Sequence, residues 1–221
     1  MKVGYHCEGH DHLILHRLLC RLCGIQESAV GWELGKAEPA SVEVILRIAA
    51  EQLVWFHDLG VAVAVLAVDN DGHPVVRPDC AWEDPARPRH WLHQRDGDAQ
   101  GLDCRLCQLE GIPRPPGAPA NWPVVVCVPV EAIEAWVLVA RGIVDGDGSL
   151  LDAENRSAGT GLKELVYGAK QASKTRVRKK ALPFLDGLAD VRAIAEHSES
   201  FRLFVEQVDR AAPALKSVRP A

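Results

Sequence analysis

The sequence has no long run of apolar residues. No stretch reaches the about 18 consecutive apolar residues that a membrane-spanning helix requires, and the first residues lack the apolar core of a signal peptide. Both absences predict a cytoplasmic protein without a membrane partner.

Low-complexity segments and internal repeats are lacking too, which argues against disordered and solenoid classes. Of the 221 residues, 48% are hydrophobic and 25% are charged, as in an ordinary globular protein. We expect one α/β domain at 1–142, with a loop-rich excursion at 73–121. A basic, helical extension at 143–221 is expected to pack on it.

A disulfide framework is not expected, because the chain has seven cysteines, an odd number, and no export signal. Strong positive charge is also missing: the net charge is −5, which is not typical of a general nucleic-acid binder. Basic residues nevertheless gather in one segment, where only Glu164 opposes them. They are Lys163, Lys170, Lys174, Arg176, Arg178, Lys179 and Lys180. Any contact with a polyanion is therefore expected to be local.

Two uninterrupted apolar runs, 61–68 and 123–129, are typical of parallel strands that are covered on both faces. A short alternating segment at 2–7 predicts a first strand, and 30–34 predicts a further short strand. Helices are predicted between these strands and after them. Their segments begin near Asp11, Ser41, Leu102, Glu131 and Phe201. The pattern predicts an α/β fold with a mostly parallel central sheet flanked by helices.

Acidic residues follow three of the predicted strands. Glu8 follows the first, Asp69 and Asp71 follow the 61–68 strand, and Glu131 and Glu134 open the helix after 123–129. The carboxyl ends of parallel strands share one edge, where ligand sites gather. Carboxylates held together repel unless a cation neutralises them, and oxygen ligands suit Mg²⁺ or Mn²⁺. The sequence therefore predicts a divalent-metal site at this edge.

Each acidic motif has a simpler interpretation when it is taken alone. Asp69-Asn70-Asp71-Gly72 is also a common turn sequence. Glu131, near the start of a helix, can complement the helix dipole. Glu134, one turn further on, is harder to explain in this way. The hypothesis of a metal site depends on the three positions together.

These residues resemble the TOPRIM domain of topoisomerases, primases and the overcoming-lysogenization-defect nucleases. In that pattern a Glu-Gly follows strand one and an Asp-x-Asp follows a later strand, as at Glu8-Gly9 and Asp69-Asn70-Asp71. The chain is more similar still to small stand-alone TOPRIM-like proteins found near bacterial defence genes. The further matching segments are 130–138 (VEAIEAWVL) and 198–204 (SESFRLF). The resembled pattern commonly continues Glu-Gly with a small or hydroxyl residue and an acid, and the chain departs from it at His10-Asp11-His12, so the resemblance does not imply a site with oxygen ligands alone.

The resemblance implies a metal-dependent phosphodiesterase or nuclease acting on nucleic acid in bacterial defence. It implies that Glu8, Asp69 and Asp71 hold a first Mg²⁺ or Mn²⁺, and that Glu134, with Glu131, helps to place a second. A lysine near the scissile phosphate would stabilise the transition state. Lys174 is preferred for this role, with Lys163 and Lys170 as alternatives. Nucleic-acid binding is assigned to Lys163, Lys170, Arg176, Arg178 and Lys179.

Two other functions stay open at this point. The carboxylates alone would suit a nucleotide- or metal-binding, non-hydrolytic component of a defence system, with a partner protein from that system. Alternatively, the pairs Cys20/Cys23 and Cys104/Cys107 could hold a structural zinc in an interaction module. Both pairs fall in predicted helices, so we expect the cysteines to pack as small core residues instead.

Overall fold

The computed structural model describes residues 1–35, 42–69, 105–129, 132–155, 161–170 and 172–217. Four strands form one sheet: β1 (Lys2–His6), β2 (Gly31–Leu34), β3 (Val63–Ala67) and β4 (Val124–Cys127). Their order is β2-β1-β3-β4 and every neighbouring pair is parallel. The predicted α/β fold with a parallel sheet and flanking helices is therefore confirmed. Within the described residues, no helix is both long enough and apolar enough to span a membrane.

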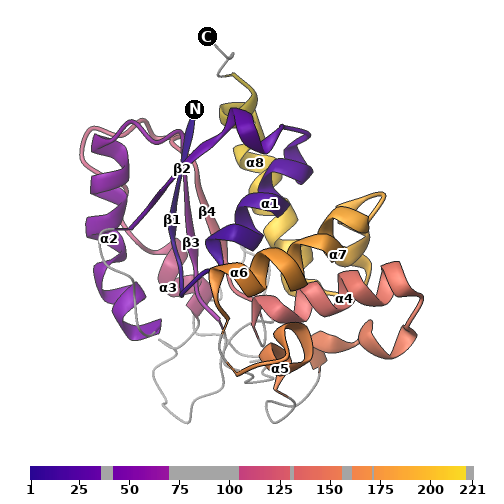
Figure 1. Ribbon diagram of the computed structural model, residues 1–221. Helices are drawn as coiled ribbons and strands as arrows, with labels where there is room; N and C mark the ends of the chain where they lie inside the picture. Colours follow the sequence, from indigo (N-terminus) through magenta and orange to yellow (C-terminus); the bar gives the residue numbers. More distant parts are fainter. Residues whose placement is uncertain (36–41, 70–104, 130–131, 156–160, 171, 218–221) are drawn as a thin grey trace, which may run out of the picture.

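Helices cover both faces of the sheet (Figure 1). Tyr5 and Val65 face one core, which they share with α1 (His12–Cys23), α4 (Ile133–Asp145) and α8 (Glu199–Ser217). Ala64 and Leu66 face a second core, with α2 (Val42–Asp58) and α3 (Arg105–Glu110) on that side. Every side chain of β3 is thus buried, which explains why this strand has an uninterrupted apolar sequence.

Two helices end at a glycine with a left-handed backbone. The backbone at Gly24, directly after α1, has a φ of 65°, and that of Gly60, shortly after α2, has a φ of 66°. Only glycine adopts this left-handed conformation without a steric cost. Asp11 stands directly before α1 as expected, but its side chain accepts no capping hydrogen bond. Ser41, the expected cap of α2, lies outside the described residues.

Helix α4 begins at Ile133 and continues to Asp145. The expected division at residue 142 therefore falls inside this helix. A methyl group at Gly142 would lie 2.9 Å from the carbonyl oxygen of Asp147, so the following turn packs directly against the helix. The chain after residue 142 is continuous in structure with the part before it.

The C-terminal part consists of short helices followed by one long one. They are α5 (Leu162–Tyr167), α6 (Lys174–Arg176), a π-helical turn (Val177–Ala181), α7 (Leu182–Gly187), a 3-10 helix (Val191–Glu196) and α8. Helix α8 contacts β4 and α1, while α5 and α7 pack on α4. Among the described residues, further short 3-10 helices lie at Glu27–Ala29, Gly148–Leu150 and Ala153–Asn155.

A buried polar network joins α4 to the start of α8. The Glu154 carboxylate accepts hydrogen bonds from the Glu199 amide at 2.8 Å and the Ser200 amide at 3.2 Å, so it caps the positive end of α8. The indole N–H of Trp136 donates to the Ser200 hydroxyl at 2.8 Å. The Trp136 ring also contacts Phe201, with ring centroids 5.0 Å apart. The segments around Trp136 and Phe201, which carry much of the TOPRIM resemblance, thus form one packed unit.

Candidate active site at the carboxyl edge of the sheet

Glu8 and Asp69 lie at the same edge of the sheet. Each follows its strand by two residues, and the strands β1 and β3 are parallel neighbours with His6 opposite Leu66. Asp69 is buried, with 7% of its surface exposed. Asp71, the third predicted ligand, lies outside the described residues. The structure therefore brings together two of the three acids predicted for the first metal.

Glu134 is a fully buried carboxylate in the first turn of α4, which follows β4. Neither of its oxygens accepts a hydrogen bond of normal geometry from the described residues. Burial raises the pKa of Glu134, although Lys163 partly offsets this effect. A fully buried carboxylate is costly unless a proton, a cation or hydrogen-bond donors compensate its charge. Glu131, its predicted companion, lies outside the described residues.

Asp11 is a site residue for which the sequence indicates another role. Its position predicts a helix cap, yet its side chain forms no capping bond. Burial raises the pKa of Asp11 well above its usual range, and the negative charges of Asp69, Glu134 and Glu8 raise it further. The one feature of the sequence that could have indicated Asp11 as a site residue is its position three residues after Glu8. Asp11 thus joins Glu8, Asp69 and Glu134, and these four acids influence one another.

Lys163 is the basic residue that interacts with all four acids. Burial lowers its pKa, but the charges of Glu134, Asp69, Asp11 and Glu8 more than compensate, so the pKa is raised overall. Tyr167 lies one turn further along α5 and is 3% exposed. Its pKa is raised by burial and then by the charge of Glu134, although its hydroxyl forms no hydrogen bond of normal geometry with a described residue. Helix α5 thus brings a cation and a phenol to the acidic cluster.

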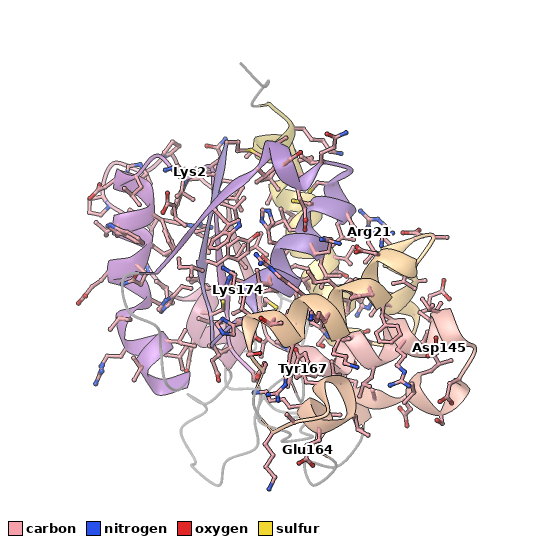
Figure 2. All side chains as sticks on the ribbon, viewed as in Figure 1. Lys2, Arg21, Asp145, Glu164, Tyr167 and Lys174 are labelled. Atoms are coloured by element: carbon pink, nitrogen blue, oxygen red, sulfur yellow. The ribbon has the colours of Figure 1, made fainter. Side chains whose placement is uncertain are left out.

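The other predicted basic residues lie on the surface. Lys170, Lys174, Arg176, Arg178 and Lys179 are at least partly accessible to solvent. Lys174 is the first residue of α6, where this helix approaches the strands (Figure 2). Its ammonium lies 5.9 Å from the centroid of the Trp32 ring. The charges of the four acids contribute to the raised pKa of Lys163. Lys174 as the catalytic cation remains a prediction, and Lys163 is the lysine placed among the carboxylates.

The acidic cluster does not form a complete metal site within the described part of the chain. No group of three or more His, Cys, Asp or Glu side chains there is arranged to hold an ion. Asp71 and Glu131, which would complete the predicted ligand sets, lie outside that part. The chemistry of the residues that are present fits a divalent cation, because Glu134 is a fully buried carboxylate and Asp11 experiences the negative charges of three neighbouring acids.

The cysteines pack as the sequence predicted where the structure describes them. Cys20 and Cys23 are buried in the core beneath α1, and burial raises the pKa of Cys20 to about 12. Helix α3, which contains Cys107, lies on the opposite face of the sheet from α1. Cys104 lies outside the described residues. The sheet thus separates the first pair from the helix of the second, which argues against a shared zinc.

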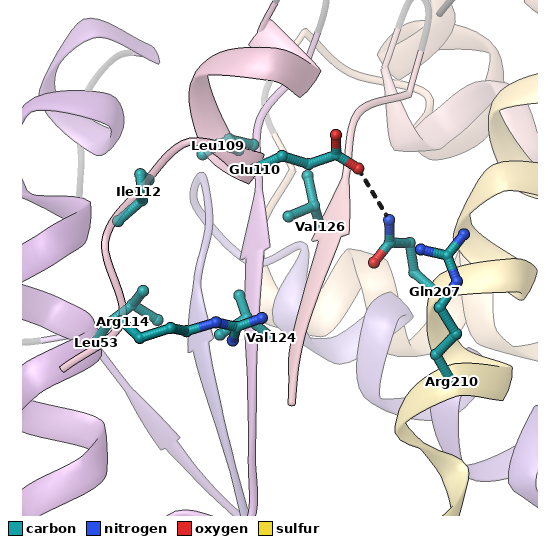
Figure 3. Close-up of a pocket in the computed structure, with 9 residues that line it drawn as sticks. All are labelled: Leu53, Leu109, Glu110, Ile112, Arg114, Val124, Val126, Gln207 and Arg210. Atoms are coloured by element: carbon teal, nitrogen blue, oxygen red, sulfur yellow. Dashed lines mark hydrogen bonds between the residues drawn. The ribbon is translucent and has the colours of Figure 1, made fainter. Parts of the chain in front are cut away.

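A small pocket lies away from the acidic cluster, beside β4 (Figure 3). Its volume is about 150 Å³. Its lining includes apolar side chains from α2 and β4, such as Leu53 and Val124, and the basic residues Arg114 and Arg210. Val124 and Val126 belong to the core on the α2 side, whereas Cys127, beside the acidic cluster, belongs to the other core. The pocket is therefore separate from the candidate active site.

Glu134→Gln is expected to change how stability depends on pH. A carboxyl with a raised pKa in the folded state stabilises the protein while it is protonated, and this contribution is lost as pH rises from the unfolded-state pKa through the folded-state pKa. The glutamine variant should therefore gain stability relative to wild type between about pH 4 and pH 8 in EDTA. Chemical denaturation of both proteins across this range measures the difference.

Adding Mg²⁺ at pH 8 should reverse that order. A cation at about 100 times its Kd stabilises the folded state by roughly 2.7 kcal/mol, and the glutamine variant should receive less of this gain because it has lost a ligand. A stability difference that stays constant across this pH range and does not respond to Mg²⁺ would contradict the assignment of Glu134.

Comparison with protein-family models, with curated proteins and with solved structures found no match for this chain.

Proposed function

We propose that this protein is a TOPRIM-like, Mg²⁺- or Mn²⁺-dependent nuclease that hydrolyses phosphodiester bonds in nucleic acid. The observation that carries the proposal is the cluster of Glu8, Asp11, Asp69 and Glu134, of which Asp69 and Glu134 are buried and with which the charge of Lys163 interacts. The parallel sheet and the packing of the 133–138 and 198–204 segments support the TOPRIM assignment. A role in bacterial defence belongs to the same proposal and rests on the resemblance.

Glu8 and Asp69, with Asp71, would hold the first metal, and Glu134, with Glu131, would help to place the second. Asp11 is an additional candidate ligand, because it interacts with Asp69 and Glu134. The bound cation would neutralise these carboxylates and act as a Lewis acid toward a phosphoryl oxygen. The four described acids lie at or next to the ends of rigid elements, which preserves their mutual geometry.

Lys163 and Tyr167 have separate roles in this proposal. Lys163 would bind a non-bridging oxygen of the scissile phosphate and stabilise the charge that develops there. Its raised pKa keeps it protonated across the physiological pH range. The Tyr167 hydroxyl lies beside Glu134 and, because its pKa is raised, stays protonated and able to donate a hydrogen bond to that carboxylate.

The exposed basic residues of α6 and the π-helical turn would bind the nucleic-acid backbone. Lys174, Arg176, Arg178 and Lys179 present side chains to solvent, where they can neutralise phosphates. Contacts of this kind carry no sequence information, and they weaken as salt increases because each one releases counterions.

Incubation of the purified protein with end-labelled DNA and RNA, each single- and double-stranded, tests the proposal. We expect cleavage with Mg²⁺ or Mn²⁺, its loss in EDTA and its recovery when Mg²⁺ is restored in excess. If no substrate is cleaved although Mg²⁺ raises the unfolding temperature, the non-hydrolytic alternative replaces the nuclease. If Mg²⁺ changes neither cleavage nor stability, the metal site itself is refuted.

A further inference from the structure

Trp32 contacts two side chains from different helices. Its ring belongs to the edge strand β2 and is half-buried. The His12 ring lies against it, with centroids 4.9 Å apart and ring planes tilted by 45°. The Lys174 ammonium lies 5.9 Å from its centroid. An edge strand, the first turn of α1 and the first residue of α6 therefore meet at one aromatic ring.

His12 packs against this ring as a buried side chain. It is 3% exposed, and neither of its ring nitrogens forms a hydrogen bond with a described residue. Its ring is also in edge-to-face contact with His10, with centroids 6.1 Å apart. His12 directly follows Asp11, so the acidic cluster and the Trp32 ring are connected by adjacent residues of one helix start.

We propose that Trp32, supported by His12, is a stacking platform for one unpaired base of a single-stranded nucleic acid, and that Lys174 binds a phosphate next to that base. This inference rests on the proposed function for the identity of the ligand. The expected substrate is a single strand, because the bases of a duplex already stack on their neighbours and expose only their edges.

The Lys174 contact with Trp32 does not prevent such stacking. A cation over an aromatic ring at an exposed site contributes only about two- to fivefold to a local equilibrium. A base that stacks on an aromatic side chain contributes roughly five- to 150-fold to affinity. The base therefore displaces the ammonium, and the phosphate that accompanies the base gives Lys174 a new partner of opposite charge.

The proposal is tested by fluorescence anisotropy with labelled oligonucleotides in EDTA, where cleavage does not interfere. Single-stranded DNA, single-stranded RNA and a duplex of the same length are compared. Trp32→Ala should weaken binding of at least one single strand about tenfold or more and change duplex binding less than about twofold. Trp32→Phe, which keeps an aromatic face, should retain most of the affinity. Trp55→Ala is the matched control, because Trp55 is also half-buried but lies on α2, across the sheet.

Lys174→Gln should weaken binding to the same single strand and reduce the slope of log affinity against log salt by about one. Equal affinity of wild type for single strands and duplex would overturn the proposal. So would single-strand binding that is unchanged in both Trp32→Phe and Trp32→Ala, with folding checked by circular dichroism. If single strands bind through Trp32 but are never cleaved, the platform stands and the nuclease proposal falls. If strands are cleaved but their binding does not depend on Trp32, the nuclease stands and the platform falls.

Discussion

Asp69→Asn is expected to lower Mg²⁺-dependent phosphodiester cleavage by roughly a thousandfold or more while the protein stays folded. Asp69 follows a fully buried strand of the sheet and raises the pKa of its neighbour Asp11 through its negative charge. Asparagine retains the shape of the side chain but removes the charge that a metal requires. The loss should therefore appear as a lower kcat with Mg²⁺ and also with Mn²⁺.

Stability should change in the opposite direction. Removing one of several mutually repelling carboxylates lowers the electrostatic repulsion in the metal-free protein. The unfolding temperature of Asp69→Asn in EDTA should therefore equal or exceed that of wild type. Single-turnover cleavage and thermal unfolding, measured on the same preparations, separate these two effects. Asp145→Asn provides the control, because this exposed acid at the end of α4 pairs with Arg141 at 3.2 Å. Undiminished cleavage by folded Asp69→Asn would refute the mechanism.

Lys163→Met is expected to lower cleavage about a hundredfold or more at every salt concentration. The ammonium of Lys163 interacts with the charges of Glu134, Asp69, Asp11 and Glu8, and in the proposed mechanism it contacts the scissile phosphate. A contact that acts in the transition state cannot be replaced by mobile ions. Methionine approximates the length and the apolar stem of lysine, and the variant therefore tests the charge instead of the packing.

Lys174→Gln should behave differently, with a defect of only a few-fold that shrinks as salt is raised. Its ammonium is exposed and contacts the Trp32 ring, and salt already weakens such surface attraction in the wild type. Cleavage rates between about 50 and 300 mM salt compare the two variants. A severe, salt-independent loss in Lys174→Gln with a mild one in Lys163→Met would return the catalytic role to Lys174, as the TOPRIM resemblance implies.

Much of the fold was predictable because its signals are local. The apolar run at 61–68 indicates a strand covered on both faces, and β3 at Val63–Ala67 is entirely buried. Gly24 indicates the end of α1 because its left-handed backbone is free of cost for glycine. The end of α4 was less predictable. Gly142 has the residue type of a helix stop, but it lies inside the helix, where the turn at Asp147 needs the space that a side chain would fill.

The site was only partly predictable. Glu8 and Asp69 are expected to share one edge of the sheet, because parallel strands align their carboxyl ends, and the register of β1 with β3 agrees with this placement. Asp11 has the position of a helix cap, since an acid before a helix usually has that role. Its side chain forms no such bond, and no pattern within the helix could have indicated that distant acids surround it.

The sequence by itself determined the strands, the parallel sheet and the edge at which the acids emerge, because alternation, helix caps and the direction of parallel strands depend on near neighbours in the chain. Only the tertiary structure decided which basic residue interacts with those acids and which side chains contact Trp32. Lys163 and Lys174 look alike in the sequence, yet α5 brings one to Glu134 and α6 brings the other to Trp32. Such choices depend on packing between segments that are far apart in the chain, and charge interactions there follow distance in space instead of distance along the chain.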